Sequence, residues 1–288
     1  FNESYLMHTS TSPQYSIIAS CDVAAAMMES PGGTALVEES ILESLDFRRA
    51  MRKVDDEWGQ DWWFKVWGPE NLSENGLENR DSWVLQQTDK WHGFGKLSES
   101  FNMLDPIKST IITPGLNVDG EFDTEFGIPA MIVTKYLAEH GVIVEKTGLY
   151  SFFIMFTIGI TKGRWNTLVA SLQQFKDDYD KNQPIWKVLP EFSQKYPMYE
   201  SIGLKDLCDK IHTVFKENNI AKLTTEMYLS NMEPAMKPTD AFAKMAHKEI
   251  ERVPIDELEG RITSVLLTPY PPGIPLLIPG ERFNKIIV

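Results

Sequence analysis

The chain has 288 residues, a length that favours one large domain or two modest ones. Hydrophobic residues make up 42% and charged residues 24%, values that exclude a disordered or fibrous chain. The formal net charge of −13 argues against nucleic acid or an anionic membrane as the main partner. Cys21 and Cys208 are too few for a disulfide framework, which indicates a reducing, cytoplasmic compartment.

Hydrophobic spacing and the positions of Pro and Gly predict six helices and five strands. The helices are expected over residues 15–28, 34–56, 128–140, 162–179, 205–218 and 239–247, and the strands over residues 62–67, 83–86, 109–113, 142–144 and 151–158. In the second helix Val37, Ile41, Leu45, Arg48 and Arg52 fall at helical spacing. A polar loop is expected around residues 71–79. This order indicates an α+β (α/β) fold, with one sheet and helices on one of its faces.

The sequence lacks the common signals of self-contained catalysis. Its five histidines are scattered and form no HExxH pair, so no metal is expected. It also has no GxGxxG, phosphate-binding GKS/T or GxSxG motif. No apolar run reaches the length of a membrane-spanning helix, so no membrane partner is expected either.

A cluster of hydroxyls at residues 9–12, which includes Ser10, comes just before Pro13 and the first predicted helix. Hydroxyls and free amides at the start of a helix can hold a phosphate group. The alternative is a plain helix cap, because Ser and Thr are preferred capping residues. The sequence pattern leaves both interpretations open.

Glu145 and Tyr270 have similar alternatives. Glu145 ends an apolar run, so it is either an edge charge paired with Lys146 or solvent, or a carboxylate that meets an ammonium group in a pocket. Tyr270 lies among four prolines, which make a stiff loop. The loop is either a tight turn with a packed aromatic ring or a rigid pocket wall. Residue patterns alone therefore name no reaction.

Six short segments, taken together and in order, are more specific. They are FNESYLMHTSTSP (1–13), WHGF (91–94), LDPIK (104–108), TPG (113–115), EKTG (145–148) and PYPPG (269–273). With these segments the whole chain resembles the bacterial ornithine/lysine/arginine decarboxylases, which use pyridoxal 5'-phosphate (PLP). The EKTG string is similar to that of the members that act on lysine.

The resemblance implies a fold-type-I PLP enzyme of which this chain is a C-terminal fragment. Residues 1–30 would be the end of the PLP-binding domain, and residues 31–288 a truncated C-terminal domain. The lysine that binds the cofactor would lie upstream of Phe1 in a Ser-x-His-Lys motif, so no catalytic residue is expected in this chain. The full-length protein would be a homodimer or a higher homo-oligomer.

Three residues carry over by position from the family. Ser10 matches a hydroxyl that reaches the PLP phosphate of the neighbouring subunit; Glu145 matches a carboxylate near the distal amine of the substrate, and Tyr270 a tyrosine of the active-site pocket. The implied reaction converts the basic amino acid L-lysine to cadaverine and carbon dioxide. The alternatives are an arginine or ornithine decarboxylase and a non-catalytic assembly module.

Overall fold

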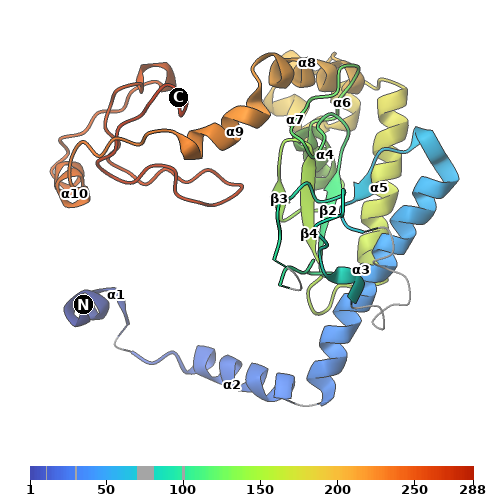
Figure 1. The fold of residues 1–288 in the computed structure, drawn as a ribbon, viewed down its shortest axis with the longest axis horizontal. Coiled ribbons are helices and arrows are strands. Elements are labelled where there is room, and N and C mark those ends of the chain that lie inside the picture. Colours follow the sequence, from blue (N-terminus) through green and yellow to red (C-terminus); the bar gives the residue numbers. More distant parts are fainter. Residues whose placement is uncertain (11, 30, 70–80, 99–100) are drawn as a thin grey trace.

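The computed structural model describes residues 1–10, 12–29, 31–69, 81–98 and 101–288 (Figure 1). The α-helices are α1 (Asn2–His8), α2 (Tyr15–Glu29), α3 (Pro31–Trp58), α4 (Ala130–Glu139), α5 (Lys162–Asp180), α6 (Ile185–Val188), α7 (Pro190–Lys195), α8 (Leu204–Glu217), α9 (Ile220–Leu229) and α10 (Pro238–Ala246). The strands are β1 (Lys65–Val66), β2 (Lys108–Ile112), β3 (Lys146–Thr147) and β4 (Ser151–Met155). Short 3-10 turns lie at Gly59–Asp61, Pro197–Tyr199 and Ile255–Glu257.

The four strands form one antiparallel sheet in the order β1-β2-β4-β3. Its register pairs Ile111 with Phe152 and Ser109 with Ile154. Side chains alternate between the two faces of a strand, so these four residues share one face. Ile111, Phe152 and Ser109 are buried there under the helical layer of α3, α4 and α5. The predicted mixed fold, one sheet with helices on one face, is confirmed.

Aromatic side chains dominate the core between this sheet face and the helices. Phe47 of α3 contacts Phe156, just after β4, with ring centroids 5.5 Å apart. Phe175 of α5 contacts Phe64 at 5.9 Å and Tyr136 of α4 at 5.2 Å. All five side chains are 0–1% exposed, and burying one such ring stabilises the fold by about 1.5–3 kcal/mol.

The predicted helices are all present, and no bound differs by more than three residues. Helix α3 shows the largest shift, because it begins at Pro31, within a Pro-Gly-Gly sequence expected to separate two helices. Proline suits the first position of a helix, where its missing N–H would have no intrahelical partner anyway. Helices α1, α6, α7 and α9 were not predicted.

Strands were predicted less well than helices. The expectation of a strand over residues 142–144 is wrong: Val142 and Val144 pack against the core and Ile143 is 81% exposed, but pairing with β4 begins only where Glu145 N donates to Phe153 O. The 62–67 strand is reduced to the two residues of β1, and the 83–86 strand to a bridge between Val84 and Met103. The polar loop at 71–79 lies outside the described residues.

The two ends of the chain extend from the sheet as separate parts (Figure 1). Helices α1 and α2 bury no residue, although α2 carries Ile17, Ile18 and Val23, each more than half exposed. At the other end α9 leads to a lobe with little regular structure, from which a loop reaches back toward β3. No helix in the described ranges is both long and apolar enough to cross a membrane.

A buried polar contact fixes the loop between β2 and α4. The Tyr150 hydroxyl lies 2.6 Å from His212 Nδ1, and His212 Nε2 lies 3.0 Å from the carbonyl oxygen of Asp123. The carbonyl can only accept, so Nε2 carries the proton and Nδ1 accepts from the tyrosine. Burial raises the pKa of Tyr150, which keeps its hydroxyl protonated as a donor.

Gly127 makes this contact possible, and its replacement tests the contact. A Cβ atom at Gly127 would lie 2.1 Å from His212 Nδ1, so Gly127→Ala must displace the imidazole. We expect a loss of about 1–3 kcal/mol in the free energy of unfolding, measured by urea denaturation. Gly163→Ala is the control, because a Cβ there meets nothing within 4 Å in helix α5 and should leave stability unchanged or raise it by up to about 1 kcal/mol. Equal effects of the two variants would contradict this account.

Candidate active-site edge

Tyr270 stands at the tip of the loop that reaches back to the sheet. A bridge between Leu267 and Leu277 closes the base of this loop. The Tyr270–Pro271 and Pro271–Pro272 peptide bonds are both cis. Gly273 has φ of 81°, and a Cβ there would lie 3.1 Å from the Tyr270 ring, so glycine lets the ring pack against the backbone. Tyr270 remains 61% exposed.

The loop meets the edge strand β3. Lys146 pairs with Phe153 of β4, and Thr147 pairs with Phe152. Thr147 belongs to the helix-covered face, where its hydroxyl donates to Thr134 of α4 at 3.2 Å. Lys146 therefore points to the opposite face, and its Nζ lies 5.3 Å from the centroid of the Tyr270 ring. An ammonium group over an aromatic face is attracted by the ring quadrupole.

Glu145 directly precedes β3, but its side chain lies on the opposite face of the sheet from Lys146. Two residues before Thr147, it shares the parity of the helix-covered face and borders a groove of about 600 Å³ together with Arg164 and Trp165 of α5. The Glu145 side chain is exposed, and no ion pair within 4.0 Å joins it to Lys146 among the residues described. Glu145 and Tyr270 therefore lie at the same edge of the sheet but on opposite faces, and it is Lys146 that makes the direct contact with Tyr270.

Ser10 lies far from that edge, in the segment between α1 and α2 (Figure 1). Its exposed hydroxyl lies 3.2 Å from both the carbonyl oxygen and the amide nitrogen of Ser12. The first turn of α2 instead bonds to the carbonyl of Gln14. Within one chain, therefore, Ser10 does not join Glu145 and Tyr270.

The Ser10 hydroxyl can donate to one phosphate oxygen. An exposed hydroxyl can donate one hydrogen bond, but residues 1–30 contain no Lys and no Arg. A cofactor that is bound covalently through a lysine cannot be anchored by this segment.

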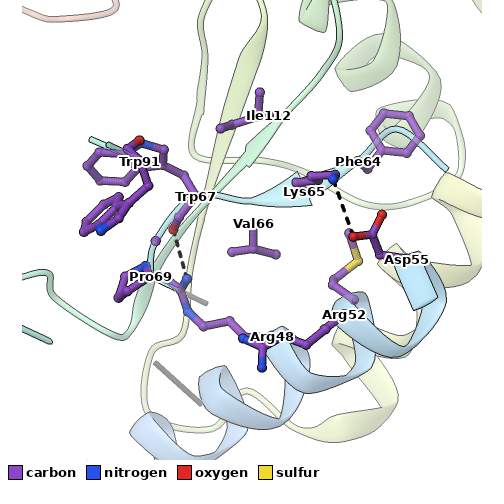
Figure 2. Close-up of a pocket in the computed structure, with 12 residues that line it drawn as sticks. Arg48, Arg52, Asp55, Phe64, Lys65, Val66, Trp67, Pro69, Trp91 and Ile112 are labelled. Carbon is purple, nitrogen blue, oxygen red and sulfur yellow. Dashed lines mark hydrogen bonds and ion pairs between the residues drawn. The ribbon is translucent and has the colours of Figure 1, made fainter. Parts of the chain in front are cut away.

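Two features of the structure were missed by sequence reasoning. The first is Lys146, which side-chain alternation within EKTG could have separated from Glu145. The second is a pocket between α3 and β1, lined by Arg48 and Arg52 (Figure 2). Both arginines occupy positions that follow the apolar spacing of α3. A charged residue on the inward face of a helix could therefore have indicated this pocket from the sequence.

Comparison with known proteins identifies the family. Residues 1–164 match the model of the Orn/Lys/Arg decarboxylase major domain, and residues 221–288 match the model of the C-terminal domain of the same family. The chain therefore belongs to the Orn/Lys/Arg decarboxylase family, whose members depend on PLP.

Several relatives align with almost the whole chain. The lysine decarboxylase LdcA of Pseudomonas aeruginosa is 50% identical over 99% of this chain and 38% of its own length. The biodegradative arginine decarboxylase of Escherichia coli is 38% identical, with 99% of this chain and 40% of the relative covered. The chain thus spans about two fifths of these relatives.

Solved structures agree with the fold. The structure of lysine decarboxylase A from Pseudomonas aeruginosa aligns with a TM-score of 0.89 at 49% identity, covering 99% of this chain and 38% of that one. The constitutive lysine decarboxylase of Escherichia coli gives 0.85 at 36% identity, with coverage of 99% and 39%.

The contact between Lys146 and Tyr270 can be measured by a double-mutant cycle. We expect Lys146→Met and Tyr270→Leu to show a coupling free energy of about 0.5–1 kcal/mol, because the site is partly exposed. The free energy of unfolding of both single variants and of the double variant supplies the cycle. Strictly additive effects would show that the loop does not rest on the ammonium group.

Proposed function

We propose that this chain is part of a PLP-dependent decarboxylase that converts L-lysine to cadaverine and carbon dioxide. The observation that supports the proposal is the β3 edge, where Tyr270 lies over Lys146 on one face and Glu145 stands as an exposed carboxylate on the other. The 50% identity to the lysine decarboxylase LdcA supports lysine as the substrate, while the constitutive lysine decarboxylase of Escherichia coli, at 36%, is about as similar to this chain as the arginine decarboxylase, at 38%.

In this proposal the residues of the edge position the substrate. PLP, when bound, supplies an electron sink for the loss of carbon dioxide. Glu145 accepts hydrogen bonds from the distal ammonium of lysine, and the rigid loop holds Tyr270 as a wall of the substrate site. Binding the remote end of the substrate orients the bond that breaks.

Ser10 would bind the cofactor of a neighbouring subunit. Its distance from the β3 edge, together with the exposed apolar surface of α2, supports a role in which residues 1–30 dock on a second copy of the enzyme. There the hydroxyl would donate to a phosphate oxygen of the neighbouring cofactor. We therefore propose that residues 1–30 complete the PLP-binding domain, that residues 31–288 belong to the C-terminal domain, and that the enzyme is a cytoplasmic homodimer or higher homo-oligomer.

Replacing Glu145 tests the substrate site. In the full-length enzyme Glu145→Ala should raise the KM for lysine about tenfold to a hundredfold, because a charge-assisted hydrogen bond to the ammonium group is lost. Glu125→Ala, another exposed carboxylate, is the control and should leave KM unchanged. Steady-state kinetics with lysine, arginine and ornithine would also assign the substrate. An unaltered KM for lysine in Glu145→Ala would remove this residue from the site.

The 288-residue chain by itself should not decarboxylate lysine. The cofactor-binding lysine motif of the family is not in its sequence, so PLP has no covalent anchor. Release of carbon dioxide from labelled lysine, with PLP added, measures this directly. Turnover by the purified chain would show that one of its own lysines holds the cofactor.

A further inference from the structure

The pocket between α3 and β1 lies at the opposite edge of the sheet from Glu145 and Tyr270, because β1 and β3 are the two edge strands. Its volume is about 300 Å³. Among the described residues that line it are three cationic side chains, Arg48, Arg52 and Lys65, and one carboxylate, Asp55.

Within the part of the chain that the structure describes, Arg48 is a buried cation without a counter-ion. Its side chain is 6% exposed and donates to two backbone carbonyls, those of Trp67 and Lys108, each at 3.0 Å. No carboxylate among the described residues pairs with it, and its Nε has no hydrogen-bond partner there. Burial lowers the pKa of Arg48 to about 10, which still leaves it charged at neutral pH. A buried charge of this kind is costly unless an anion offsets it.

The carboxylate of the pocket does not supply that anion. Asp55 Oδ2 lies 3.6 Å from Lys65 Nζ, and this pair occupies one end of the pocket (Figure 2). At the opposite end, where Trp67, Pro69 and Trp91 gather, none of the described lining residues is acidic.

The aromatic end is held in place by hydrogen bonds. Trp67 and Trp91 meet edge to face with centroids 4.7 Å apart, and Trp67 Nε1 donates to the Trp91 carbonyl at 3.0 Å. His92 Nε2 donates to the carbonyl of Gln86 at 2.9 Å, which leaves Nδ1 to accept from Phe94 N at 3.0 Å. These bonds present a fixed apolar wall beside the uncompensated guanidinium.

We propose that this pocket binds a small organic monocarboxylate with a flat apolar body. One uncompensated guanidinium balances one negative charge, which favours a monoanion over a phosphate dianion. The tryptophans and Pro69 provide the apolar contact, and a guanidinium is the group best matched to a carboxylate. The volume suits a substituted benzoate rather than a nucleotide.

The probe for this site is 4-bromobenzoate, added to the PLP-loaded full-length enzyme. Calorimetry should detect saturable binding that remains in the presence of lysine, since the two edges of the sheet are separate. Diffraction at the bromine absorption edge should place the bromine beside Trp67 and Trp91. 4-Bromobenzamide, which has the same shape without the charge, and inorganic phosphate should bind at least tenfold more weakly.

Three arginine variants show which guanidinium group binds the carboxylate of 4-bromobenzoate. Arg48→Met and Arg52→Gln should each weaken 4-bromobenzoate binding about tenfold or more, as expected for loss of a charged partner. Arg49→Gln, next to Arg48 but exposed and paired with Asp46, should not change it. If Arg48→Met does not fold, Arg52→Gln and the amide comparison decide. Absence of binding, equal binding of the amide, a bromine located elsewhere, or unchanged affinity in Arg52→Gln would overturn the proposal.

Discussion

The aromatic packing that joins α3 and α5 to the sheet is the constraint on which the rest of the molecule depends. Phe47 contacts both Phe156 and Trp165, with centroids 5.5 and 6.1 Å away, so a single α3 residue ties the end of β4 to α5. Phe175 extends the same packing to Phe64, next to β1. Because this core fixes the central strands β2 and β4, it also fixes where the two edges lie. Each edge strand has two residues, too few to hold a position without the core.

The two edges then differ in what they offer. At β3 the exposed face carries an ammonium group covered by the ring of Tyr270, and the helix-covered side carries Glu145. At β1 the sheet meets α3 through Arg48, whose hydrogen bonds to Trp67 and Lys108 link the helix to β1 and β2. One buried guanidinium therefore joins two elements of the fold and leaves its charge uncompensated. The helix-covered side of the β3 edge therefore offers a carboxylate to a cationic group, and the β1 edge offers a guanidinium to an anionic one.

The sequence predicted helices well because their ends carry Pro and Gly and their apolar spacing is long. Strands were harder: residues 142–144 alternate as a strand should, yet no partner strand lies beside them, and pairing is a tertiary property. Sequence reasoning placed Glu145 and Tyr270 at one site but could not show which neighbour of Glu145 meets the ring, since that depends on the register of β3. It also assigned no role to Arg48. The sequence places this residue among the apolar positions of α3, but only the structure shows that its side chain is buried. The roles of Ser10, Glu145 and Tyr270 stay predictions.

The N-terminal arm connects these observations to assembly. Ile17, Ile18 and Val23 are each more than half exposed on α2, and burying such a side chain fully contributes about 1.5–3 kcal/mol. Docking of the arm would thus be driven by apolar contacts that a single chain leaves unused. In the proposed enzyme Ser10 could reach a cofactor phosphate only after that docking. Affinity for the cofactor and affinity between subunits would then be linked, because a ligand that binds only the assembled state stabilises assembly by mass action.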